Sequence, residues 1–327
     1  MTSHPDRPVR PASPVPAGMG WGIALAVLAA CISGLAIYLN SFAVRQLPDA
    51  AVYTTLKNGV AAIVLVVAAL GLGAIRDVRA IERRSWPLIL AVGVVGGSVP
   101  FILFFTGLAQ ASAPGAAFIQ KTLFVWVALL AVPFLGERLG LVSIAALGVL
   151  LVGQALILPP DGLRWGSGET LILGATLLWA VETILVKRLL GSIPTSVMAA
   201  LRMGIGLVVL FAYLALTGKL AAVAALNPGQ WGWVLLTGVV LAAYVGSWFA
   251  ALQRAAASVV ASVLVLGAVV TGGLTAVSKG SPPSLVLVTG YILIVLAAGL
   301  IAGWSVRAAR QLADAGGPGV TVDAGPG

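Results

Sequence analysis

Residues 284–306 read SLVLVTGYILIVLAAGLIAGWSV, a stretch without a single charged side chain. A run of about 20 apolar residues is long enough to cross the hydrocarbon core of a bilayer as an α-helix. Similar runs, bounded by charge, proline or polar clusters, occur at about 20–41, 50–74, 86–108, 113–133, 141–158, 168–190, 195–217, 231–251 and 257–277. We therefore expect an all-α integral membrane protein with ten transmembrane helices.

The composition of the 327-residue chain supports a membrane protein. Hydrophobic residues make up 60% of it and charged residues 9%, against about 25% charged residues in a typical soluble domain. A soluble fold of this length would lack the polar surface needed to cover its core. The single cysteine, Cys31, excludes an intramolecular disulfide, and the single histidine, His4, excludes a His/Cys metal cluster. We expect no metal and no cofactor.

Basic residues predict the orientation of the helices. The net charge is +9. If both termini are cytoplasmic, the inner loops and tails carry most of the Lys and Arg side chains, and the outer loops carry only Arg45, Arg164, Lys219 and Lys279. Basic residues in short loops resist translocation, so we expect both termini on the cytoplasmic side of a bacterial inner membrane. The basic residues form no continuous face, so we expect no nucleic-acid binding.

The two ends of the chain differ from its apolar centre. Residues 1–18 are rich in proline and arginine, and the segment 307–327 ends in glycine and proline. We expect both to be disordered cytoplasmic tails. The first apolar run, from Trp21 to about Asn40, is longer than the core of a signal peptide, about 7–15 residues, so we interpret it as the first membrane helix.

The two halves of the chain repeat one another. Trp21-Gly22 recurs 144 residues later as Trp165-Gly166, and the same offset relates Leu108 to Leu252, Ala113 to Ala257 and Gly136 to Gly280. With one extra residue, Leu56-Lys57 matches Leu201-Arg202. Each half holds five crossings, an odd number, so the second copy should lie inverted relative to the first. Inverted repeats are common in secondary transporters.

Motifs in both halves resemble a known family. The stretch GLAQASAPGAAFIQ at 107–120, followed by Phe134-Leu135-Gly136-Glu137-Arg138-Leu139, resembles the signature of the EamA family of the drug/metabolite transporter superfamily. The second half is similar around Leu177-Leu178-Trp179 and from Ala251 to Ser258, but Gly280 is followed by Ser281-Pro282-Pro283 without a glutamate. The resemblance implies two five-helix EamA repeats, 19–158 and 159–306, and a pathway lined mainly by helices 1, 3, 4, 6, 8 and 9. It implies no particular substrate.

Charged side chains inside the apolar runs are candidate functional residues. An ionisable side chain at the centre of a membrane helix costs about 2.5–3.5 kcal/mol on insertion scales, so each needs a partner or a function. Lys121 lies near the middle of the fourth run, beside Gln120. It is either a pathway cation that attracts an anionic solute or a member of a buried ion pair. The second repeat has Val265 at this position.

Glu182 lies at mid-depth in the sixth run, one turn after Trp179 and at the repeat position of Tyr38. A buried carboxylate can take up and release a proton, so Glu182 is our candidate for proton coupling. The alternative is a static partner of Lys121 or Arg202. Lys57 and Arg202 occupy equivalent positions in the two repeats, which favours a structural role for both.

Uncharged polar residues complete the candidate solute-binding set of Lys121, Gln120, Glu182, Trp179, Tyr38, Ser98, Tyr244, Trp248 and Ser262. Ser98 precedes Pro100 inside the third run, where proline removes a backbone hydrogen bond and can expose a carbonyl. Glu137 lies in the turn before the fifth run, and we expect its carboxylate to stabilise the N-terminus of that helix.

The favoured function is a secondary permease, not an enzyme, that binds a small-molecule solute between the repeats within the lipid bilayer. Three intramembrane cations against one carboxylate favour an anionic solute such as an amino acid or organic acid, and the resemblance implies efflux. The alternatives are a passive channel, a lipid-acting enzyme and a non-transporting scaffold. The GxxxG pairs Gly93/Gly97 and Gly299/Gly303 are compatible with a homodimer and do not establish one.

Overall fold

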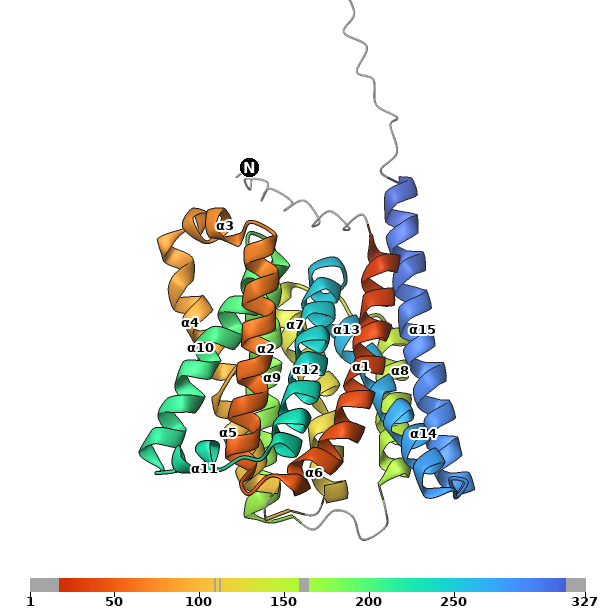
Figure 1. The fold of residues 1–327 in the computed structure, drawn as a ribbon. Helices are drawn as coiled ribbons and strands as arrows, with labels where there is room; N and C mark the ends of the chain where they lie inside the picture. The colour runs from red at the N-terminus through yellow and green to blue at the C-terminus, as the bar shows by residue number, and fades with distance from the viewer. Residues whose placement is uncertain (1–17, 109, 112, 159–164, 316–327) are drawn as a thin grey trace, which may run out of the picture.

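The computed structural model describes residues 18–108, 110–111, 113–158 and 165–315, and every regular element within these ranges is a helix (Figure 1). In chain order the elements are α1 (Met19–Gln46), α2 (Ala50–Gly71), α3 (Ala74–Ala80), η1 (Arg83–Ser85), α4 (Trp86–Val95), α5 (Val99–Leu108), α6 (Ala113–Lys121), α7 (Leu123–Leu135), α8 (Leu141–Ile157), α9 (Ser167–Leu189), α10 (Thr195–Leu216), α11 (Ala221–Ala224), α12 (Pro228–Arg254), α13 (Ala257–Val263), η2 (Leu264–Leu266), α14 (Gly267–Lys279) and α15 (Leu285–Ala315).

These elements form ten crossings, as the sequence predicts. Three of them are interrupted: the third consists of α4 and α5, the fourth of α6 and α7, and the ninth of α13, η2 and α14. Among the described residues, nine crossings are long and apolar enough to span a membrane. The remaining crossing, the fifth in chain order, is α8, a shorter apolar helix of 17 residues that packs along α15.

The ends of two helices correct the sequence prediction. The first helix continues to Gln46, past the expected end near residue 41. The last helix continues to Ala315, so residues 307–315 are helical, although we expected them to be part of a disordered tail. The segment is built largely from alanine, arginine, glutamine and leucine, which favour helix after the apolar run has ended. The expectations for 1–17 and 316–327 lie outside the described residues.

The element bounds reproduce the repeat. The helices α6, α7 and α8 begin 144 residues before α13, α14 and α15, and α2 and α10 each contain 22 residues and begin 145 residues apart. Each repeat therefore has five crossings with matching interruptions in its fourth crossing. This arrangement confirms the two inverted five-helix repeats.

The helix ends define two sides of the molecule (Figure 1). We call the side on which α1 begins and α15 ends the terminal side; α3 also lies there. The opposite side, on which α1 ends and α2 begins, is the distal side and carries α6, α11 and the end of α14. Residues Lys57 and Arg202, each seven residues after its helix begins, therefore lie nearer the distal and the terminal side, respectively.

Contacts between the two interrupted fourth crossings differ between the sides. On the terminal side, α13 of the second repeat packs against α7 of the first. In the repeat, α13 corresponds to α6 and α7 corresponds to α14, so the equivalent contact on the distal side would join α6 and α14. These two helices form no comparable interface among the described residues. The fourth crossings of the two repeats are thus joined at their terminal halves and separate at their distal halves.

Small residues bring the third crossing against α10. A Cβ added at Gly97 would lie 2.7 Å from the Arg202 carbonyl oxygen and 3.0 Å from the Gly206 Cα, so the two backbones touch at this point. Such close approach is a common use of glycine in membrane helices. The GxxxG pair Gly93/Gly97 therefore packs within the chain, whereas nothing lies within 4 Å of a Cβ at Gly299 or Gly303.

Candidate functional site

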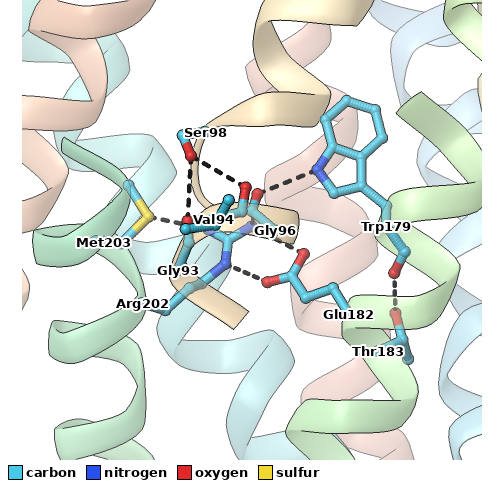
Figure 2. A network of polar contacts seen from close by, with 9 residues as sticks. All are labelled: Gly93, Val94, Gly96, Ser98, Trp179, Glu182, Thr183, Arg202 and Met203. Carbon is cyan, nitrogen blue, oxygen red and sulfur yellow. Dashed lines mark hydrogen bonds and ion pairs between the residues drawn. The ribbon is translucent and has the colours of Figure 1, made fainter. Parts of the chain in front are cut away.

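The interruption between α4 and α5 exposes a backbone carbonyl to other helices (Figure 2). In a continuous helix the Gly96 carbonyl would accept a hydrogen bond from the residue four positions later, but that residue is Pro100, which has no N–H. The Gly96 oxygen instead accepts the Arg202 Nη2 at 2.9 Å and the Trp179 Nε1 at 3.3 Å. The expected freed carbonyl is therefore satisfied inside the protein.

Glu182 and Arg202 form a buried ion pair at this carbonyl. The Arg202 Nε donates to Glu182 Oε1, and Nη2 donates to Oε2 at 3.2 Å. Nη1 lies 2.9 Å from the Met203 sulfur, and the guanidinium lies 5.9 Å from the centroid of the Trp248 ring. The exposed fractions are 4% for Arg202 and 0% for Glu182. Of the two partners that the sequence left open for Glu182, the structure selects Arg202.

This ion pair needs the glycine at position 96. A Cβ there would overlap the Glu182 carboxylate. The two-pronged contact between a guanidinium and a carboxylate is geometrically specific and charge-assisted. The interruption, the ion pair and Trp179 therefore form one unit that ties the third crossing to α9 and α10.

The aromatic candidates surround the same unit. The Trp179 ring packs edge-on against Phe101 at a centroid distance of 5.4 Å, and Tyr244 stacks on Trp248 at 6.0 Å. Trp248 is buried and Tyr244 is half-buried. Tyr38 instead packs against Phe42 in α1, with ring centroids 5.0 Å apart. The aromatic residues near the ion pair thus come from α5, α9 and α12.

The two serine candidates are satisfied within their own crossings. The Ser98 hydroxyl donates to the Val94 carbonyl at 3.0 Å, and the Ser262 hydroxyl donates to the Ser258 carbonyl at 2.7 Å. Both side chains are buried. Because each hydroxyl donates to the carbonyl four residues earlier in its own crossing, neither serine is presented to a ligand through a free donor in this arrangement.

Lys121 is the last residue of α6, directly before the interruption at Thr122. Its side chain is half-buried and makes no hydrogen bond, ion pair or aromatic contact with the described part of the chain. Gln120 beside it is also half-buried. The neighbouring Thr122 hydroxyl donates to the Ile119 carbonyl at 2.6 Å and accepts the Trp126 indole N–H. Lys121 therefore retains a full set of free donors.

Lys57 differs from its repeat counterpart Arg202. It is 4% exposed and has no ion-pair or hydrogen-bond partner among the described residues. Its ammonium lies 5.1 Å from the centroid of the Tyr53 ring and 5.8 Å from that of Phe105. Equivalent cations in the two repeats are thus paired in one case and unpaired in the other.

Glu137 corrects a sequence expectation. The chain turns at Gly136, which has a left-handed φ of 70°, and the Glu137 carboxylate caps α13 of the other repeat instead of the helix that follows it. It accepts the Ala257 N–H at 2.6 Å, the Ser258 N–H at 3.2 Å and the Ser258 hydroxyl. Free N–H groups and the positive end of a helix dipole favour a carboxylate at this place.

Two basic residues at the end of α9 add contacts on the terminal side. Lys187 donates to the carbonyls of Leu252 and Ala255 where α12 ends, and Arg188 donates to the Phe134 carbonyl at 2.6 Å. We call the inter-repeat contacts of Glu137 and Arg188 the terminal latch. The motif Gly-Glu-Arg marked Glu137 in the sequence, but no local signal indicated that its partners lie 120 residues away.

The comparisons with known proteins agree with this architecture. The family model described as "EamA-like transporter family" matches residues 20–158 and 166–303. A solved structure described only as "Crystal structure of protein" has 18% sequence identity and a TM-score of 0.71, and the match covers 87% of this chain and 99% of that one. Likeness at this identity shows the fold. The search of curated proteins found no match. Because both repeats match, the chain belongs to the EamA-like transporter family of the drug/metabolite transporter superfamily and is a multi-pass membrane protein.

Proposed function

We propose that the chain is a secondary transporter that exports a small metabolite with a carboxylate or another anionic group, such as an amino acid or an organic acid. Membership of a family of transporters supports the general activity. The observation that carries the anionic solute is Lys121, which is half-buried beside an interruption and has no partner among the described residues. A cation within a membrane normally has a counter-charge or a functional role, and we assign this counter-charge to the solute.

Alternating access fits the unequal contacts of the two repeats. With the terminal side placed in the cytoplasm, as the basic loops favour, the terminal latch closes the inner end between α7 and α13. The separated distal halves, α6 and α14, then belong to an outward-facing state. Rocking of one repeat against the other would open the latch and bring α6 and α14 together.

The ion pair of Glu182 and Arg202 favours a positioning role for both residues over proton coupling. A proton-coupled cycle through Glu182 would have to separate a fully buried carboxylate from a guanidinium that contacts both of its oxygens. A Glu182→Gln variant tests this directly. We expect it to keep whatever dependence on the pH gradient the wild type shows, whereas loss of that dependence with folding intact would assign coupling to Glu182.

The transport assay uses the full chain in proteoliposomes and a panel of labelled amino acids and organic acids, with and without a pH gradient. We expect saturable flux of at least one anionic solute. Lys121→Met should raise its KM by about tenfold or more, because one charge-assisted contact contributes about 1.5–3 kcal/mol. Lys279→Met, which removes an exposed lysine at the end of α14, is the matched control and should leave KM unchanged.

Three other results would contradict the proposal. Flux that does not saturate would favour a passive channel. Absence of flux for every solute, together with a well-folded protein, would favour a non-transporting scaffold. Saturable transport with the same KM in the Lys121→Met variant would remove the assigned role of Lys121.

A further inference from the structure

A second lysine, Lys57, has no counter-charge among the described residues and is buried more deeply than Lys121. Lys57 in α2 is 4% exposed, and its ammonium lies over the rings of Tyr53 and Phe105. A cation–π contact contributes less free energy than the removal of an ion from water costs. The two rings therefore do not compensate for the burial of this charge.

The residues next to Lys57 have unused hydrogen-bonding groups. The hydroxyls of Thr54 and Thr55 and both polar atoms of the Asn58 amide are buried and have no hydrogen-bond partner in the described structure. Residues three and four apart lie on one face of a helix, so Thr54, Lys57 and Asn58 share a face. Buried polar groups without partners are rare in native proteins, so these groups beside Lys57 are available to bind a polar ligand.

The repeat indicates what kind of group would complement Lys57. Lys57 and Arg202 are equivalent, and the counter-ion of Arg202 is the carboxylate of Glu182. The first repeat has Tyr38 at the position of Glu182. Lys57 thus lacks the carboxylate that completes the corresponding site in the second repeat.

We propose that Lys57, with Thr54 and Asn58, binds the carboxylate of a ligand, which serves as the counter-charge of Lys57 as Glu182 does for Arg202. The ammonium and the hydroxyl and amide N–H groups supply donors to the carboxylate oxygens, and Tyr53 and Phe105 provide an aromatic wall for an apolar body. The site lies in the distal half of α2. Identification of the ligand with the transported solute rests on the proposed function, but binding itself does not require transport.

Equilibrium binding to the purified full chain in nanodiscs tests this site. Isothermal titration uses acetate, benzoate and phenylacetate as anionic probes, and benzyl alcohol as a neutral probe of similar shape. We expect at least one carboxylate to bind with a Kd that Lys57→Met weakens by about tenfold or more and Lys57→Arg largely preserves. Binding of benzyl alcohol should not change with Lys57→Met, and the exposed Lys279→Met should leave all titrations unchanged.

Thermal unfolding separates a binding role from a structural role. Because Lys57→Met removes an unpaired buried charge, we expect its Tm in the absence of ligand to equal or exceed that of the wild type. A lower Tm with unchanged carboxylate binding would assign Lys57 to the scaffold and overturn the proposal. So would the absence of any Lys57-dependent binding among the three carboxylates. Lys57-dependent carboxylate binding in a protein that shows no transport would support this site and contradict the proposed transporter function. Transport without Lys57-dependent binding would support the transporter function and contradict this site.

Discussion

Removing either partner of the Glu182–Arg202 ion pair should destabilise the fold strongly, whereas removing both should not. The Glu182→Met variant leaves a guanidinium that is 4% exposed with the Gly96 carbonyl as its remaining oxygen acceptor. Breaking a buried pair costs about 3–5 kcal/mol, whereas replacing both partners by apolar residues of similar volume is often neutral. We expect about 3–5 kcal/mol for Glu182→Met and for Arg202→Met, and less than about 2 kcal/mol for the double variant.

The free energy of unfolding can be measured by titration with sodium dodecyl sulfate in mixed micelles, with tryptophan fluorescence as the signal. Glu82→Met is the control, because Glu82 pairs with Arg84 on the surface, where the two side chains are 60% and 85% exposed. Removing an exposed pair should change stability by less than about 1 kcal/mol.

The double variant decides whether the reasoning holds. If its loss of stability equals the sum of the two single losses, the coupling energy is zero and the side chains do not act as a pair. The same result would remove the physical basis for comparing Lys57 with Arg202.

Three further predictions test the terminal side, the distal side and the contact between the third crossing and α10. Glu137→Gln weakens the cap of α13, so a cysteine engineered at Ala261 should react faster with a thiol reagent from the terminal side; an unchanged rate would reject the latch. Partial burial raises the pKa of Asp49, but hydrogen bonds from Lys219 and the α2 amides bring it below its usual value. The stability that ionised Asp49 contributes is therefore fully present above its pKa in the unfolded chain and is lost as pH falls through its lower pKa in the folded protein. Asp49→Asn should flatten the curve of unfolding free energy against pH in this acidic range. Gly97→Val should lower the Tm sharply, because its side chain would meet the α10 backbone; a Tm equal to that of the wild type would contradict the contact.

Much of the fold follows from one-dimensional features of the chain. The length and spacing of the apolar runs predicted ten crossings, because an uninterrupted membrane helix must be about 20 apolar residues long. The consequence of Pro100 was also local, since a missing N–H frees the carbonyl four residues earlier. The extension of α15 to Ala315 was not predicted, because the apolar run ends before Arg307 whereas residues with high helix propensity continue beyond it.

The candidate site was less predictable from the sequence. Its residue types were recognisable because charges are rare in apolar runs, and Glu182, Arg202, Lys57 and Lys121 were all found in this way. Which of them meet could not be inferred, because an ion pair depends on how helices distant in the chain rotate and pack. The serines show the same limit, since their bonds to nearby carbonyls are set by rotamers.

The sequence by itself determined the number of crossings, the repeat and the identities of the intramembrane charges, because bilayer thickness and the cost of burying charge act on each segment separately. Only the tertiary structure decided that Arg202 has a counter-ion while Lys57 and Lys121 have none in the described part of the chain, and that Glu137 caps α13 of the other repeat. The physical reason is that hydrogen bonds and ion pairs act over about 3 Å. They depend on a helix-to-helix arrangement that close packing of small residues selects after the individual helices have formed.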